Sequence, residues 1–378
     1  MTAGFAVRPT VSLRKRLPLR HFRQVQGPRL RELFHQQPEP VVDRHDRELL
    51  AVALGATLYA PATRPDLVRG IQRGAARGVC SMVIDLEDAV PDSEAPAAQR
   101  QAVRALDLLA ASEESNPLLF VRVREPEAVR QIAGALGAGA AALTGFVFPK
   151  FTAVRGPEYL AALNEAADML ERPLYGMPVL ESPVLVHRET RDRELLRIAR
   201  LLDRHRERVL AVRVGATDLC SAFGIRRDRE RTVYDVRVVA DVIADIVNYL
   251  GRADGSGFVI TGPVWEYFAG HRGREADGLL REIALDRANG MQGKTVIHPG
   301  QVAAVHAMSV VTHEEYTDAC EILRGADGGV AASAYANKMN EMRPHRNWAR
   351  RTLLRARVFG VARREVSFAE LLTAAAVG

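Results

Sequence analysis

The feature that most constrains the fold of this chain is a regular alternation of short apolar runs and longer amphipathic stretches. Eight runs are apolar almost throughout, at residues 54–60, 81–86, 118–123, 145–149, 174–180, 209–215, 257–261 and 294–297. Such continuous runs are typical of strands that are buried on both faces of a parallel sheet. Helical patterns lie between them, at residues 65–77, 95–109, 126–136, 157–170, 187–204, 236–250 and 279–289.

This rhythm predicts a (β/α)8 TIM barrel, because eight strand–helix units in about 250 residues is the usual size of that fold. The main alternative is a doubly wound α/β sheet, which usually has a Gly-rich phosphate loop after its first strand. Here the first run leads into YAPATR at 59–64, which is not such a loop. We therefore expect a basic N-terminal arm (1–50), with one short helix near residues 28–34, and a TIM-barrel catalytic domain (51–312). A helical C-terminal extension or cap (313–378) would cover the site or bridge subunits.

Composition narrows the class of protein. The chain is 47% hydrophobic and 26% charged, which is an ordinary globular balance with enough apolar residues for a large core. No apolar run reaches the roughly eighteen residues of a membrane-spanning helix, and the first residues lack the apolar centre of a secretory signal. The three cysteines form no C-x-x-C pair, so disulfides and zinc fingers are not expected. We expect a cytoplasmic protein, with an Arg-rich transit peptide around residues 12–16 as the alternative.

The net charge of +6 comes almost entirely from arginine, since the chain has four lysines, Lys15, Lys150, Lys294 and Lys338. An arginine excess is common in proteins from GC-rich genomes, and it also suits a small anionic substrate such as a keto acid or a coenzyme A thioester. No nucleic-acid-binding motif is present, and the basic residues form no stripe interleaved with aromatic residues. Nucleic acid is therefore not an expected partner.

Charged residues gather where the predicted strands end. Asp85, Glu87 and Asp88 end the second strand, and six strands in all finish in polar residues of complementary sign. A charge at a strand end often marks only the exit into solvent. In a TIM barrel, however, the active site lies at the carboxyl ends of the strands. Carboxylates that converge there suit Mg2+, which takes oxygen ligands and few protein carboxylates. Mg2+ is thus the expected cofactor, with Mn2+ as the alternative.

Six short motifs resemble, in the same order, those of the citrate lyase β-subunit and HpcH/HpaI aldolase superfamily. They are IDLEDAV at 84–90, VRV at 121–123, FPK at 148–150, VLES at 179–182, GATDL at 215–219 and IHPGQ at 297–301. The resemblance implies a TIM-barrel lyase that cleaves a carbon–carbon bond next to a carbonyl. It also implies a homo-oligomer, a trimer or larger.

Carried over position by position, the resemblance assigns roles to the residues at these motifs. Glu181 and Asp218 would bind Mg2+, and Arg122 would bind the carboxylate of the substrate. Glu87 and Asp88 would hold metal-bound waters or the arginine, and they could equally be structural. Three further residues complete the candidates. Arg64 could bind an anionic group of the substrate or begin a helix in solvent, and Lys150 could bind the substrate or pair with the acidic cluster. His298 could touch the substrate or close the barrel.

The chain also departs from the coenzyme A lyases. The loop after Asp218 is charged, at residues 224–235, where that family is rich in glycine and serine. Together with the motifs at 20–22, 54–59, 262–267 and 337–348, this loop resembles a narrower branch, the barrel lyases associated with tellurium-resistance gene clusters. The departure leaves the use of coenzyme A open. The charged loop could hold a phosphorylated ligand, although such a loop is more often solvated.

The expected reaction is a retro-aldol or retro-Claisen cleavage of a keto acid, hydroxy acid or acyl-coenzyme A. Its general base is not assigned, and Lys338, Glu341 and His345 of the extension are candidates by chemistry alone. The first alternative is a catalytically weak barrel that binds a metal or metabolite within a stress-response assembly. The second is a phosphoenolpyruvate-type phosphotransferase or mutase, which would need phosphate-binding glycines that are not found here.

Overall fold

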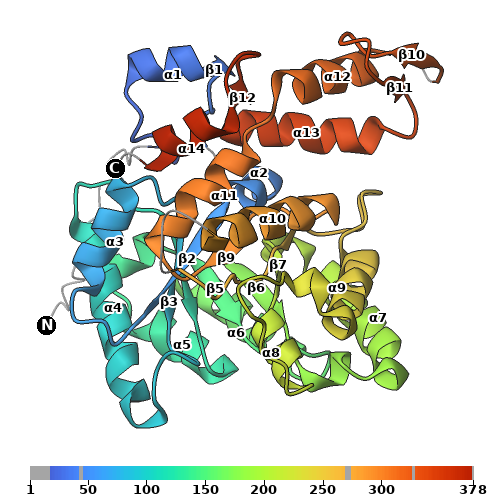
Figure 1. Cartoon of the computed structure of the whole chain (residues 1–378). Helices are drawn as coiled ribbons and strands as arrows, with labels where there is room; N and C mark the ends of the chain where they lie inside the picture. Colours follow the sequence, from blue (N-terminus) through green and yellow to red (C-terminus); the bar gives the residue numbers. More distant parts are fainter. Residues whose placement is uncertain (1–17, 42–45, 269–273, 326–327, 377–378) are drawn as a thin grey trace, which may run out of the picture.

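The computed structural model describes residues 18–41, 46–268, 274–325 and 328–376, and its centre is a barrel of eight parallel strands (Figure 1). The order around the barrel is β8-β7-β6-β5-β4-β3-β2-β9, and a parallel bridge between Gly262 and Lys294 joins the two ends. The predicted (β/α)8 barrel is confirmed. The strands are β2 (Ala56–Pro61), β3 (Ser81–Asp85), β4 (Leu118–Arg122), β5 (Leu143–Phe148), β6 (Tyr175–Leu180), β7 (Val212–Val214), β8 (Ile260–Thr261) and β9 (Lys294–Val296).

Successive side chains of each strand face the barrel interior and the helical shell in turn. On β3, Val83 belongs to the interior cluster with Phe120 of β4 and Val147 of β5. Met82 and Ile84 belong instead to the cluster that includes the apolar faces of the surrounding helices. Every residue of β3 is buried. Burial on both faces therefore explains why the strands are continuous apolar runs in the sequence.

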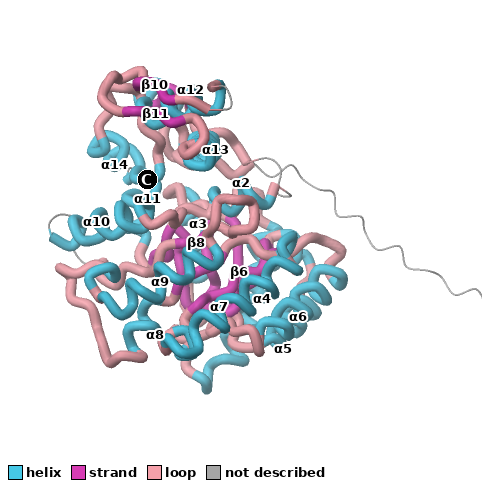
Figure 2. Tube along the Cα trace, turned by 90° about the vertical axis from the view of Figure 1, so that its right-hand side faces the viewer, coloured by secondary structure: helices cyan, strands magenta, loops and turns pink. Residues whose placement is uncertain are grey.

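Helices enclose the strands, as Figure 2 shows from the side. A proline in the first turn of α4, α5 and α6 starts each of these helices, because proline lacks only an N–H that would have no helical partner there. The helices of the shell are α3 (Leu67–Ala76), α4 (Ala95–Ala111), α5 (Pro126–Ala135), α6 (Gly156–Met169), α7 (Arg188–Arg204), α9 (Arg237–Leu250), α10 (Arg274–Ala288) and α11 (Val302–Ser309), with a short α8 (Ala216–Ser221) directly after β7.

The described part of the N-terminal segment is more regular than the sequence indicated. The expected short helix is α1 (Gly27–Leu33), and β1 (Phe34–Gln36) follows it. A further helix, α2 (Arg47–Ala53), was not expected. It begins at Asp46, whose carboxylate accepts a hydrogen bond of 3.0 Å from the backbone N–H of Leu49.

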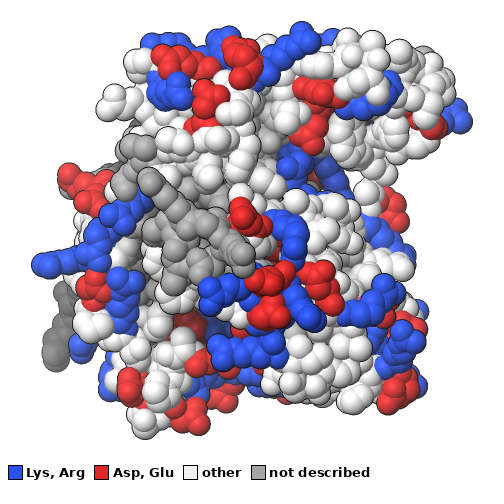
Figure 3. All heavy atoms as spheres, in the orientation of Figure 1, with Lys and Arg blue, Asp and Glu red and all other residues white. Residues whose placement is uncertain are grey.

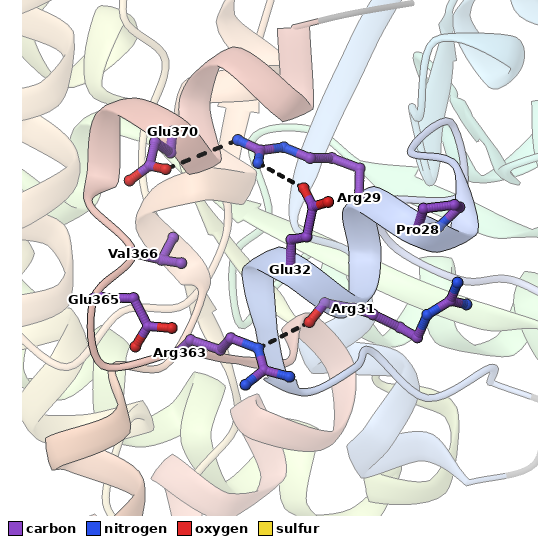
Figure 4. Close-up of a pocket in the computed structure, with 8 residues that line it drawn as sticks. All are labelled: Pro28, Arg29, Arg31, Glu32, Arg363, Glu365, Val366 and Glu370. Carbon is purple, nitrogen blue, oxygen red and sulfur yellow. Dashed lines mark hydrogen bonds and ion pairs between the residues drawn. The ribbon is translucent and has the colours of Figure 1, made fainter.

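The C-terminal extension joins this N-terminal segment. It contains α12 (His313–Arg324), β10 (Val330–Ala332), β11 (Met339–Glu341), α13 (Arg346–Phe359), β12 (Val361–Ala362) and α14 (Phe368–Ala376). β12 pairs antiparallel with β1, with Ala362 opposite Phe34. Figure 4 shows the polar contacts beside this pairing. Arg29 lies 3.9 Å from Glu370, and Arg363 donates a hydrogen bond of 2.8 Å to the carbonyl oxygen of Arg31.

The extension lies at the end of the barrel where the strands begin. Val358 and Phe359 of α13 share one buried cluster with Cys80 and Leu118, which stand at the starts of β3 and β4. α13 also packs against α2, just before β2. The described extension therefore covers the end of the barrel opposite to the carboxyl ends of the strands.

Two buried histidines fill the space between the N-terminal segment and α11. The rings of His21 and His306 meet edge to face with their centroids 4.5 Å apart. His21 Nε2 donates to the carbonyl oxygen of Ala53 at 3.0 Å, and His306 Nε2 accepts from the backbone N–H of Ala56 at 3.3 Å. Gly55 lies between them with φ +53°, and a Cβ at this position would crowd both rings. Burial lowers the pKa of His21 to about 4 and that of His306 well below its usual range.

Candidate active site

Three carboxylates surround one arginine at the ends of β3 and β4. Arg122 donates from Nε and Nη2 to the two oxygens of Asp85, at 2.6 and 2.7 Å. Its Nη1 lies 2.9 Å from Glu87 Oε2 and 3.4 Å from Asp88 Oδ2. Burial lowers the pKa of Arg122, but the hydrogen bonds and charge of Asp85 outweigh this effect and raise it overall. Most of the N–H groups of Arg122 are therefore already engaged by protein carboxylates.

Lys150 connects this cluster to the next carboxylate along the barrel. It follows β5 with φ 48°, a left-handed conformation that is uncommon for a residue with a side chain. In this conformation its backbone N–H donates to Glu181 Oε1 at 2.9 Å, while its Nζ contacts Glu87 and lies 3.2 Å from Asp88. Lys150 thus pairs with the acidic cluster, which is the alternative to its expected role in substrate binding.

Glu181 and Asp218 form a second acidic pair, at the ends of β6 and β7. Burial and the negative charge of Asp218 raise the pKa of Glu181 to about 7. Burial and the charge of Asp88 raise the pKa of Asp218. Gly215 makes room for the pair, because a Cβ at this position would overlap the carboxylate of Glu181.

The donor set of this second pair fits a divalent cation. Among the described residues, no lysine, arginine or histidine is within ion-pair distance of Glu181 or Asp218. Within the same residues, no group of three or more histidine, cysteine, aspartate or glutamate side chains is arranged to hold a metal. Mg2+ needs no such group, since it commonly uses one or two carboxylates together with water and substrate oxygens. Glu181 and Asp218 are therefore the residues that could hold it.

A cavity of about 470 Å3 joins both acidic groups to the barrel interior. Asp85, Asp88, Arg122, Glu181 and Asp218 line it near the strand ends, and Tyr59, Arg213 and Thr295 line it from deeper positions on the strands. The guanidinium carbons of Arg122 and Arg213 lie 5.4 and 5.5 Å from the centre of the Tyr59 ring. One end of the cavity is thus acidic, whereas the deeper part contains arginine and hydroxyl groups.

The sequence matches one family over most of its length. The profile of the C–C bond lyases of the TIM-barrel fold matches residues 48–361. The chain belongs to this family. No curated protein matches the sequence significantly.

Solved structures share the fold of this C–C bond lyase at low sequence identity. A citrate lyase from Burkholderia xenovorans is 20% identical, covers 84% of this chain and 96% of its own, and has a TM-score of 0.61. The protein CitE from Mycobacterium tuberculosis, solved with magnesium, acetoacetate and coenzyme A, is 20% identical. It covers 81% of this chain and 99% of its own, with a TM-score of 0.53. At these identities the likeness demonstrates a common fold.

Most of the residues predicted for the site of this C–C bond lyase lie together. Glu87, Asp88, Arg122 and Lys150 contact one another, and Lys150 reaches Glu181. Arg64 does not line the cavity: its guanidinium pairs with Asp66 on the surface.

His298 follows β9 and accepts a hydrogen bond of 3.1 Å from the backbone N–H of Gly300, while its ring stacks on Phe268. The candidate bases of the extension are distant from the cavity, because the extension covers the other end of the barrel. Lys338 there is held by Glu314 and Asp318.

Sequence reasoning missed the deeper residues of the cavity, Tyr59, Arg213 and Thr295. A signal was present, because Arg213 interrupts an apolar run between two valines, and a charge within a buried strand needs a partner. The loop at 224–235 was expected to be solvated, but Arg227 is 5% exposed and contacts the buried Glu282 of α10. That loop is thus partly anchored to the barrel.

The described helices and the face of the molecule drawn in Figure 3 bear on membrane and nucleic-acid partners. None of the described helices has the length and apolar character needed to cross a membrane. On the face drawn in Figure 3, basic and acidic side chains are interspersed rather than gathered into one basic patch.

Proposed function

We propose that this C–C bond lyase is Mg2+-dependent and cleaves a keto acid or hydroxy acid next to its carbonyl or hydroxyl group. The observation that carries the proposal is the pair of the buried Glu181 and the half-buried Asp218, which has no cationic partner among the described residues and lines the same cavity as Arg122. Two like charges close together in a partly buried site are unfavourable unless a cation accompanies them. In CitE of M. tuberculosis, a protein of the same fold, magnesium is present together with acetoacetate and coenzyme A.

In the proposed site, the protein groups mainly orient the bound groups and neutralise their charges. Glu181 and Asp218 would hold the cation, which when bound would stabilise negative charge on the substrate oxygen as the bond breaks. The backbone N–H of Lys150 fixes one oxygen of Glu181. Arg122 and the ammonium group of Lys150 hold Glu87 and Asp88 at the mouth, where these carboxylates could orient water. The remaining donor capacity of Arg122 would contribute to binding a substrate carboxylate.

The resemblance to the tellurium-resistance branch supports a second candidate, a catalytically weak barrel that binds a metal or metabolite. The acidic pair would bind a metal in either function, so the binding of keto acids distinguishes the two candidate functions. Coenzyme A remains part of the proposal only as a possible substituent of the substrate. The same titrations with Mn2+ in place of Mg2+ test whether Mn2+ serves as the cofactor.

The test is calorimetric titration of the Mg2+-loaded protein with pyruvate, glyoxylate, oxaloacetate and acetyl-coenzyme A. We expect Mg2+-dependent binding of at least one keto acid, and its loss in Asp218→Asn and Glu181→Gln. Glu207→Gln, which changes an exposed carboxylate ahead of β7 and so at the opposite end of the strand from the pair, is the matched control and should bind normally. Metal binding without any response to keto acids would favour the second candidate. Full metal-dependent binding in Asp218→Asn would contradict the metal site itself.

A further inference from the structure

Arg213 crosses the barrel interior without an acidic partner. It is 1% exposed, and its Nη1 donates to the hydroxyl of Thr57 at 3.3 Å. Its Nη2 donates to the hydroxyl of Thr295 at 2.6 Å, and its Nε has no hydrogen-bond partner. The guanidinium thus bonds only to neutral groups, although arginine keeps its charge in proteins.

The other buried cations of the described chain have acidic partners. Four lysine or arginine residues are buried, and three of them contact a carboxylate: Arg191 pairs with Asp245, Arg227 with Glu282, and Lys294 with Glu282 and Asp286. Arg213 alone among these four has none. A buried charge is costly unless it is paired, and the Tyr59 ring beside it offsets only part of this cost. An anion is therefore the group that the surroundings of Arg213 lack.

The position of Arg213 relates it to the acidic pair. Arg213 lies opposite Val179 of β6 in the sheet register, and Glu181 follows two residues later on the same face of the chain. Two residues of a strand span ~6.6 Å, so Arg213 lies about one layer of side chains deeper than Glu181. Thr261, its neighbour on β8, also has a buried hydroxyl without a partner. Two unsatisfied polar groups thus lie side by side below the acidic pair.

We propose that Arg213 binds a second anionic group of the substrate, so that the substrate is a short dicarboxylic acid. This proposal rests on the proposed function for the position of the reacting end, which would lie near Glu181 and Asp218. The opposite carboxylate would reach down the cavity to Arg213 and Thr295, which both line it. Arg122 is less suited to this role, because Asp85, Glu87 and Asp88 already engage most of its donors.

Two acids that differ at one end provide the probe. Malate and 2-hydroxybutyrate share an α-hydroxy carboxylate, but malate ends in a carboxylate and 2-hydroxybutyrate in a methyl group. Both are titrated calorimetrically into the full-length protein, with and without Mg2+. Because a charge-assisted hydrogen bond at Arg213 is available to malate alone, we expect wild type to bind malate at least about tenfold more tightly. Equal affinities for the two acids, or no binding of either, would overturn the proposal.

Variants of Arg213 then assign the preference to this residue. Arg213→Gln should reduce the preference for malate to within about threefold and leave the affinity for 2-hydroxybutyrate unchanged. Arg213→Lys keeps the charge without the planar fork and should retain part of the preference. Thermal unfolding verifies that each variant is folded. If both acids weaken equally in a folded Arg213→Gln, the residue is structural and the proposal is wrong. If the variants do not fold, the relative affinities of wild type for malate and 2-hydroxybutyrate still test the proposal.

The Asp218→Asn variant separates this proposal from the proposed function. A preference for malate that depends on Arg213 and persists without Mg2+ would support the anion subsite while the metal-dependent lyase proposal fails. Mg2+-dependent binding of both acids with equal affinity would leave the lyase proposal standing and overturn the dicarboxylate. Loss of both acids in Asp218→Asn, together with loss of the malate preference alone in Arg213→Gln, would support both.

Discussion

Arg122 and Asp85 meet through two parallel hydrogen bonds of 2.6 and 2.7 Å, in which both oxygens of the carboxylate face the fork of the guanidinium. The two residues end neighbouring strands of the barrel and stand opposite each other in the sheet register. The pair therefore joins the ends of β3 and β4 in addition to the backbone ladder. A lysine cannot reproduce this geometry, because its ammonium is a single point of charge.

We predict that Arg122→Lys lowers the free energy of unfolding by about 1–3 kcal/mol, because the buried Asp85 loses a bidentate partner. Urea denaturation measures this change. Arg130→Lys is the matched control, since Arg130 makes a similar two-point contact with Glu165 on the surface and should change stability by less than about 1 kcal/mol. Equal losses in the two variants would contradict a special role for burial at Asp85.

Lys294 holds two buried carboxylates under β9. Its Nζ lies 3.0 Å from Glu282 and 2.7 Å from Asp286, and both carboxylates are almost completely buried. We predict that Lys294→Met destabilises the protein by about 3–5 kcal/mol, because it leaves Asp286 without a cation and Glu282 with Arg227 alone. The loss should be smaller at pH 5.5 than at pH 8. Burial raises the pKa of Asp286, removal of Lys294 would raise it further, and a group whose pKa is raised on folding favours the folded state at low pH.

Thermal and urea unfolding at both pH values measure this effect. Arg237→Gln is the control, since Arg237 is an exposed cation with a surface carboxylate partner. Adding Asp286→Asn to Lys294→Met should restore part of the stability, because it removes the carboxylate that Lys294→Met leaves without a cation. A loss in Lys294→Met that does not depend on pH would indicate a packing defect instead of unpaired carboxylates.

His21 should make the protein acid-sensitive. Its pKa is lowered to about 4 by burial, whereas an unfolded histidine titrates near 6.5. Protonation therefore favours the unfolded chain, so the stability contributed by neutral His21 is complete above pH 6.5 and is lost progressively toward pH 4. For this residue alone we expect a loss of about 2 kcal/mol between pH 7 and pH 5. Urea midpoints across this range measure it.

The variant His21→Gln provides the comparison, because glutamine can donate to the carbonyl oxygen of Ala53 and does not titrate. It should be less stable than wild type at pH 7 but show a smaller loss toward pH 5. His306, whose pKa is also lowered by burial, would account for part of the remaining dependence. Parallel pH profiles in wild type and His21→Gln would show that His21 is not the sensor.

The strands and the carboxylates at their ends could be predicted, because each depends on a local sequence pattern. Burial on both faces makes a strand such as β3 continuously apolar, and the carboxyl end of each strand fixes where Asp85, Glu181 and Asp218 lie. α2 was missed because a short, buried helix has apolar residues on every side. Its run Leu49-Leu50-Ala51-Val52-Ala53 shows no helical period and merges with the strand that follows.

Other features depend on partners that are distant in the sequence. Arg227 stands in a loop of charges that looks solvated, and only the approach of Glu282, 55 residues away, makes it a buried ion pair. The Arg213 guanidinium contacts the hydroxyls of Thr57 and Thr295, which lie 156 and 82 residues away in the sequence. The sequence around Arg213 therefore does not indicate that these partners are neutral. No local pattern indicates which end of the barrel the extension would cover.

The contact of α13 with the starts of the strands has a consequence for how the chain folds during synthesis. Every strand of the barrel is complete by Val296, but Val358 and Phe359, which seal the underside, emerge from the ribosome some sixty residues later. β1 likewise cannot pair until β12, its partner strand, has been synthesised. A nascent barrel that already carries all the candidate site residues would thus still expose an apolar underside. Closure of the barrel underside depends on a segment that is synthesised after the barrel itself.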